Sequence, residues 1–122
     1  METLHPLSFN PPIVGKFYEL YRLTHRWQMN FAKPQRYSLG TKLCSLLLDS
    51  LAEIYYLNAL PNSLKANRLL LLAARNDTIK ILWRLALDTK TINFYQYETA
   101  QSILQTTGKM IGGWIKFSKE HA

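Results

Sequence analysis

Apolar residues recur along most of the chain at steps of three and four, the spacing that gathers side chains on one face of an α-helix. Four stretches with this pattern predict helices at about residues 12–31, 39–60, 63–89 and 93–118. No stretch alternates apolar and polar residues as a half-buried strand does, and no internal repeat is present. Short connectors between helices favour antiparallel neighbours. The pattern therefore predicts an all-α fold, an antiparallel up-and-down four-helix bundle over residues 11–119, preceded by a flexible N-terminal arm at residues 1–10.

The first two predicted helices are delimited by prolines and capping residues. Asn10-Pro11-Pro12 is typical of a helix start, because a side chain that caps free N–H groups precedes prolines whose missing N–H costs little there. Pro34 predicts a break between the first and second helices. Ser38 is placed to cap the second helix with its hydroxyl.

The last two predicted helices begin in the same way. Pro61 predicts the end of the second helix, and Asn62 or Ser63 is expected to cap the third. Asn93 with Gln96 three residues later is a variant of the capping box, in which each residue's side chain accepts a hydrogen bond from the other's backbone.

The first, second and fourth helices each carry a main apolar stripe that we expect to form the core. The predicted core residues are Ile13, Phe17, Leu20, Thr24, Trp27 and Phe31 in the first helix, Leu39, Leu43, Leu46, Ser50, Ile54 and Leu57 in the second, and Ala100, Ile103, Leu104, Thr107, Ile111 and Trp114 in the fourth.

The first three helices are apolar on more than one face. A surface helix usually buries one stripe, and larger exposed apolar patches mark interfaces. In the third helix one row holds Leu70, Leu71, Ala74, Ile81, Leu82 and Leu85, and a second row holds Leu72, Ile79, Trp83 and Ala86. The second rows predict a subunit interface at Val14, Tyr18, Tyr21, His25, Leu48, Leu51, Tyr55 and Trp83. Deeply buried helices of an ordinary bundle are an alternative explanation.

The net charge favours a polyanionic partner. With 15 Lys and Arg against 8 Asp and Glu, the chain carries +7 at pH 7, and such a charge promotes nucleic-acid binding through counterion release. The candidate contacts avoid the core stripes: Arg22, Arg26, Arg36, Lys109, Lys116 and Lys119. The alternative is that these cations only keep the protein in solution. No base-reading module is present, so RNA and DNA remain equal candidates.

The sequence carries no pattern of catalytic or metal-binding residues. His5, His25 and His121 lie far apart, and no glutamate within the predicted helices has a histidine three residues later, as a di-iron bundle requires. Cys44 is the only cysteine and falls inside an apolar run. We therefore expect a protein without cofactor, metal or enzymatic activity. The sequence also lacks a signal peptide and an apolar run long enough to span a membrane, so a cytoplasmic protein without membrane contact is expected.

Two motifs carry a resemblance to a known family. Pro34-Gln35-Arg36-Tyr37-Ser38-Leu39-Gly40 resembles the junction of helices 1 and 2 in four-helix bundles related to the 23S rRNA intervening-sequence proteins. Gly108-Lys109-Met110-Ile111-Gly112-Gly113-Trp114-Ile115-Lys116 looks like the last-helix motif of one branch, the accessory variability determinant proteins of diversity-generating retroelements. The similarity runs from about Gly15 to Lys119.

The resemblance implies a function for the whole chain. It implies a ring-shaped homopentamer that binds the retroelement's reverse transcriptase and its RNA, and supports mutagenic cDNA synthesis without performing the chemistry. An alternative stays open, a structural or interaction protein of the wider intervening-sequence type with no retroelement role. Within the second motif, Gly112-Gly113 suggests either close approach of another backbone or fraying of the helix end.

Overall fold

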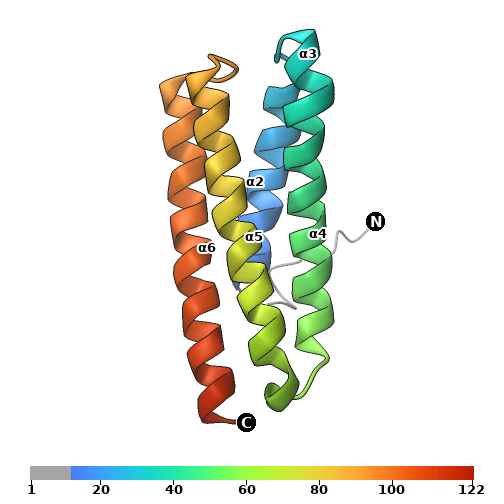
Figure 1. Cartoon of the computed structure of the whole chain (residues 1–122), viewed down its shortest axis with the longest axis vertical. Coiled ribbons are helices and arrows are strands. Elements are labelled where there is room, and N and C mark those ends of the chain that lie inside the picture. Colours follow the sequence, from blue (N-terminus) through green and yellow to red (C-terminus); the bar gives the residue numbers. More distant parts are fainter. Residues whose placement is uncertain (1–11) are drawn as a thin grey trace, which may run out of the picture.

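The computed structural model describes residues 12–122, so the predicted arm and the predicted cap Asn10 lie outside the described residues. This part of the chain is helical and contains no strand, which confirms the all-α class (Figure 1). Its elements are α2 (Pro12–Gln28), the short α3 (Lys33–Gln35), a π-helical turn η1 (Arg36–Gly40), α4 (Thr41–Asn58), α5 (Asn62–Asp88) and α6 (Phe94–Glu120).

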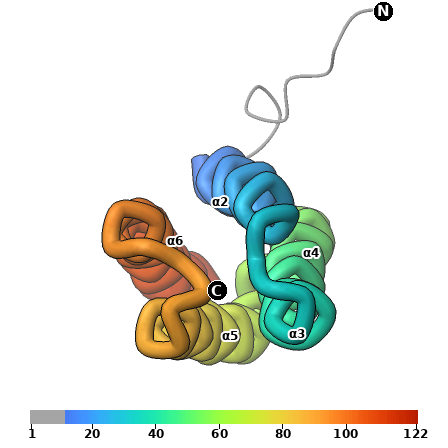
Figure 2. Tube along the Cα trace, turned by 90° about the horizontal axis from the view of Figure 1, so that it is seen from above, coloured from blue at the N-terminus to red at the C-terminus, as the bar shows by residue number. Residues whose placement is uncertain are grey.

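The four long helices pack side by side as a bundle. The α2–α4 junction and the α5–α6 turn lie at the top of Figure 1, and the α4–α5 connection lies at the bottom. Seen from above, the helices occupy the corners of a square, and each packs against two neighbours in the order α2, α4, α5, α6 (Figure 2). With 17 residues, α2 is much shorter than α5 and α6, which have 27 each.

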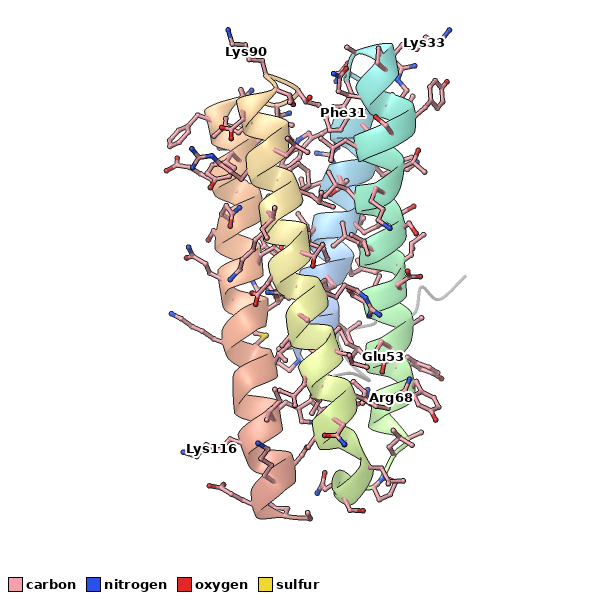
Figure 3. The ribbon with its side chains drawn as sticks, in the orientation of Figure 1. Phe31, Lys33, Glu53, Arg68, Lys90 and Lys116 are labelled. Carbon is pink, nitrogen blue, oxygen red and sulfur yellow. The ribbon has the colours of Figure 1, made fainter. Side chains whose placement is uncertain are left out.

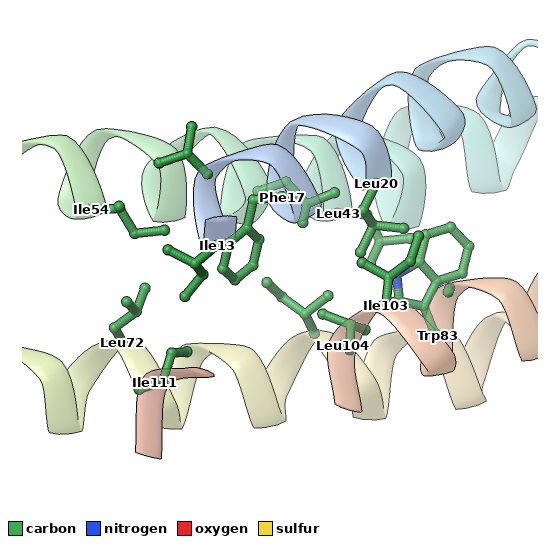
Figure 4. Packing of buried hydrophobic residues seen from close by; sticks show 14 of the residues in the cluster. Ile13, Phe17, Leu20, Leu43, Ile54, Leu72, Trp83, Ile103, Leu104 and Ile111 are labelled. Atoms are coloured by element: carbon green, nitrogen blue, oxygen red, sulfur yellow. The ribbon is translucent and has the colours of Figure 1, made fainter. Parts of the chain in front are cut away.

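The core runs along the centre of this square (Figure 4). Phe17, Leu43, Ile54, Trp83 and Leu104 are fully buried there. The predicted stripes of α2, α4 and α6 are confirmed, although four of their members are only half-buried: Trp27, Leu39, Leu46 and Trp114.

The interface prediction for the second apolar row of α5 is wrong. This row faces the core, with Leu72, Ile79, Trp83 and Ala86 all fully buried. The first row is exposed at Leu70, Leu71, Ile81 and Leu85. Both rows are apolar, so periodicity alone could not choose between them.

Two contacts of α5 explain its orientation. The Nδ2 of the buried Asn76 donates to the backbone oxygen of Leu104 at 3.1 Å, and its Oδ1 accepts from the Thr107 hydroxyl at 2.6 Å. Trp83 stands edge-on to Trp27, with ring centroids 5.7 Å apart. A buried amide needs such partners, and an unpaired one costs roughly 1–3 kcal/mol. The face that carries Asn76 and Trp83 therefore turns inward.

The second helical segment begins at Lys33, six residues before its predicted start. Pro34 lies in the first turn of this segment, where its missing N–H costs little. It therefore belongs to the start of the helical segment and not to the break before it. Ser38 is not the cap, because its hydroxyl donates to the Pro34 oxygen at 2.7 Å within the helix. The preceding helix ends at Gln28, and Phe31, in the connection, is nevertheless buried.

The side chain of Gln28 holds the end of α2 against the π-helical turn. Its Nε2 donates to the Arg36 oxygen at 2.8 Å, and its Oε1 accepts from the Cys44 thiol at 3.3 Å. Gly40 is buried beside it, and a Cβ at this position would lie 2.8 Å from the Cγ of Gln28. The absence of a side chain at Gly40 is what lets the two segments approach this closely.

The other two predicted caps have opposite outcomes. Helix α5 has Pro61 at its N-cap and no side-chain cap, so the assignment to Asn62 or Ser63 is wrong. The capping box of α6 is confirmed, because the Gln96 N–H donates to Asn93 Oδ1 at 2.8 Å and the Asn93 N–H donates to Gln96 Oε1 at 3.0 Å.

Two glycines should respond in opposite ways to replacement by alanine. Gly113 is exposed inside α6, and a Cβ there meets nothing within 4 Å, so Gly113→Ala should raise the free energy of unfolding by about 1 kcal/mol. Gly40→Ala should lower it by about 1–3 kcal/mol, because Gln28 must move and give up its hydrogen bonds. Urea denaturation of both variants beside the parent chain measures the two shifts, and equal shifts would contradict this account.

Candidate nucleic-acid interface and assembly surfaces

Five of the six candidate cations project into solvent. Arg22 and Arg26 are exposed on α2, and Lys109, Lys116 and Lys119 are exposed on α6. Figure 3 shows Lys116 extending away from the bundle. Among residues 12–122 none of the five forms an ion pair. Their positive charge is therefore available to an external anion, on the outer sides of two helices that pack against each other.

Arg36 is used inside the chain. Its guanidinium donates to the backbone oxygens of Met29 at 3.2 Å and Phe31 at 3.4 Å, where α2 gives way to the connection. The residue is only partly exposed, beside the ring of Tyr37 at 6.0 Å. The sequence predicted that Arg36 contacts nucleic acid. In the structure its guanidinium instead forms hydrogen bonds within the α2–α4 junction.

Another cation, Arg68, is paired with a carboxylate of the same chain. Arg68 of α5 forms an ion pair with Glu53 of α4 at 2.9 Å and stacks over the Tyr56 ring at 4.5 Å (Figure 3). The hydrogen bond to Glu53 is the largest cause that raises the pKa of the guanidinium. The pair is at the surface, so it links the two helices with a modest contribution to stability.

The predicted interface rows of α2 and α4 come together on one side of the molecule. Tyr21 and His25 of α2 and Leu48 of α4 line a single hollow of about 360 Å³. Members of the two rows are strongly exposed: Tyr18 is 45% exposed, Leu48 48% and Tyr55 76%. We call this side the α2–α4 face, and it consists of Tyr18, Tyr21, His25, Leu48, Leu51 and Tyr55.

Two residues of the predicted interface do not belong to it. Trp83 is fully buried and Val14 is 9% exposed, because both pack in the core of their own chain. Their side chains are not available to a second copy, so the interface prediction is wrong at these two positions.

The structure adds an apolar surface that was not predicted as an interface. Leu70 is 51% exposed, Leu71 66%, Ile81 68% and Leu85 47%, all on the outer side of α5. We call these four residues the outer α5 face. The sequence signal was present, since both rows of α5 are apolar, but the interface was assigned to the row that is buried.

Two observations on the described part of the chain concern metal-binding and thiol groups. No three His, Cys, Asp or Glu residues cluster there as a metal site requires. Partial burial raises the pKa of the Cys44 thiol, which lowers its fraction of reactive thiolate. None of the helices from Pro12 onward is both long enough and apolar enough to cross a bilayer.

Comparison with known proteins adds no assignment. No family model, no curated protein and no solved structure matches the chain. A functional proposal therefore depends on the surfaces described above and on the two motifs that carry the resemblance.

The role of Arg36 can be separated from that of the exposed arginines by unfolding experiments. Arg36→Gln removes two charge-assisted hydrogen bonds and should lower the free energy of unfolding by about 1–3 kcal/mol. Arg22→Gln, at an exposed position, should change it by less than about 0.5 kcal/mol. Urea midpoints that coincide for the two variants would show that Arg36 does not hold the junction.

Proposed function

We propose that this chain is a non-enzymatic, oligomeric adaptor that binds nucleic acid together with a retroelement reverse transcriptase, and so supports mutagenic cDNA synthesis. The proposal assigns it an antiparallel up-and-down four-helix bundle as its scaffold. The observation that carries it is the exposure of Arg22, Arg26, Lys109 and Lys116 on regular helices, with no ion-pair partner in residues 12–122.

These cations suit contact with phosphates rather than with bases. Side chains four residues apart, such as Arg22 and Arg26, project from the same side of a helix. Lys109 and Lys116 lie two turns apart on α6 and are both exposed. Contacts of this kind position a protein on nucleic acid without reading its sequence. Binding should therefore depend on salt and tolerate any sequence.

Assembly is supported by the presence of two different apolar faces. The α2–α4 face and the outer α5 face lie on different helices and have different compositions. When one face of a subunit packs against the other face of its neighbour, the contact is head-to-tail, and such contacts close into rings or extend as filaments. A ring repeats each basic surface by symmetry, so weak phosphate contacts combine into stronger binding.

The pentameric state and the reverse transcriptase partner are proposed from the resemblance. Its second motif, Gly108 to Lys116, contains Lys109 and Lys116, two of the exposed cations. The motif that carries the family resemblance therefore also contains two of the lysines proposed to contact nucleic acid.

The salt dependence of nucleic-acid binding tests the proposal. Affinity for RNA and DNA should fall steeply as salt rises, because each phosphate contact releases counterions. The double variants Arg22→Gln with Arg26→Gln, and Lys109→Gln with Lys116→Gln, should weaken binding to all sequences alike. Each should reduce the slope of log affinity against log salt by about 1 per contact removed. Filter binding at several salt concentrations measures this, and affinity that does not depend on salt excludes these surfaces.

Light scattering of charge-substituted variants tests the assembly. Tyr18→Glu or Leu48→Glu on the α2–α4 face, and Ile81→Glu on the outer α5 face, should each dissociate the oligomer and leave helicity intact, because each buries a charge in the contact. Ser102→Glu, at an exposed position outside both faces, should have no effect.

Mixing two variants identifies the kind of contact. The Leu48→Glu chain keeps an intact outer α5 face and the Ile81→Glu chain keeps an intact α2–α4 face. A head-to-tail interface therefore predicts that the mixture forms heterodimers. A parent chain that is monomeric at micromolar concentration would contradict the assembly, and a mixture that stays monomeric would contradict the head-to-tail contact.

A further inference from the structure

Two adjoining hollows lie on the side of the bundle formed by α5 and α6. One hollow of about 320 Å³ is lined by Phe94, Tyr97 and neighbouring polar residues of α6. A second hollow of about 410 Å³ lies between α5 and α6 and is lined by Lys80 and Lys109, among others. Gln105 lines both hollows, so they adjoin. We call the two together the α5–α6 groove.

The aromatic end of the groove offers a ring to a flat ligand. Phe94 is 60% exposed, and its ring lies 6.2 Å from that of Tyr97 at an interplanar angle of 33°. Arg84 of α5 lies next to this end. Its guanidinium forms an ion pair with Asp88 at 3.0 Å, and the pKa of the group is raised first by this hydrogen bond and then by Tyr97. The charge of Arg84 is therefore largely offset, and the exposed ring of Phe94 is the group at this end that can stack an unpaired base.

The middle of the groove carries free hydrogen-bonding groups. Among residues 12–122, the side chains of Glu98, Ser102 and Gln105 have no hydrogen-bond partner, although all three line the hollow next to Phe94. Gln101 is held in place because its Nε2 donates to the Lys80 backbone oxygen at 3.1 Å, which leaves its Oε1 able to accept. Donors and acceptors of this kind match the edges of unpaired bases.

The other end of the groove is cationic. The Lys80 ammonium lies close to Gly108 of α6, 3.7 Å from where a Cβ of that residue would stand. Asp77 is 3.9 Å from this ammonium and offsets part of its charge, whereas Lys109 is exposed and unpaired in the described chain. Phe94 and Lys109 are separated by about four turns of α6, or about 22 Å.

We propose that the α5–α6 groove binds a short single-stranded segment of nucleic acid. One base stacks on Phe94, the edges of neighbouring bases meet Ser102, Gln105 and Glu98, and the backbone reaches Lys80 and Lys109. A duplex fits this site poorly, because its bases are already stacked and paired. The inference rests on the proposed function and adds to it the form of nucleic acid that this side of the bundle selects.

Phe94→Ala with a matched neighbour tests the groove. Tyr95 is 73% exposed, one residue further along the same helix, and lines neither hollow. Phe94→Ala should weaken binding of a labelled 12-nucleotide oligo-U or oligo-dT by about 5- to 150-fold, the effect of losing one aromatic–base stack. Tyr95→Ala should leave it unchanged, and Phe94→Trp should preserve it. None of the three variants should alter binding of a hairpin duplex, and circular dichroism checks that each is folded.

The outcomes separate this inference from the proposed function. If the parent chain binds neither single strands nor duplex, both fail together. If it binds nucleic acid but Phe94→Ala and Tyr95→Ala behave alike, or Phe94→Ala weakens duplex binding equally, the groove is overturned and the adaptor function stands. The oligo-U and oligo-dT arms show whether the 2′-hydroxyl contributes, and a stacking site predicts the same loss on both.

Discussion

The orientation of α5 depends on one buried amide. Asn76 satisfies both ends of its side chain on α6, by donating to the Leu104 oxygen and accepting from Thr107. Rotating α5 to bury its other apolar row would leave this amide and the Thr107 hydroxyl without each other, and it would also expose Trp83. Because both rows are apolar, the polar contact and the contact of Trp83 with Trp27 distinguish the two orientations.

That choice determines what the surface of the bundle displays. With Leu72 and Trp83 inside, Leu71 and Ile81 face outward and form an apolar surface separate from the α2–α4 face. It also places Lys80 over Gly108 and forms the hollow between α5 and α6. The surface proposed for assembly and the groove proposed for single strands thus follow from the same helix orientation.

The sequence predicted the elements where one physical signal was dominant. The predicted core stripes of α2, α4 and α6 do face inward, and the Asn93–Gln96 box marked the start of α6. It failed where two signals competed. Pro34 is compatible with a break or with a first turn, and the π-helical turn after it removed Ser38 from a capping position. The sequence could not distinguish Arg36 from the exposed cations, because its acceptors are backbone oxygens. It also could not predict the α5–α6 groove, because the residues that line it come from two helices that share no motif.

The unequal helix lengths make the two ends of the bundle different in local stability. Helix α2 has 17 residues from Pro12 onward, whereas α5 and α6 have 27 each. Within the described chain, the start of α5 and the end of α6 therefore have fewer packing neighbours than the opposite ends of these two helices. A hollow of about 380 Å³ between Pro12, Lys65 and Trp114 marks this thinner packing. We therefore expect backbone amides at that end to exchange through partial unfolding, and those beside Trp83 to exchange when the whole bundle unfolds.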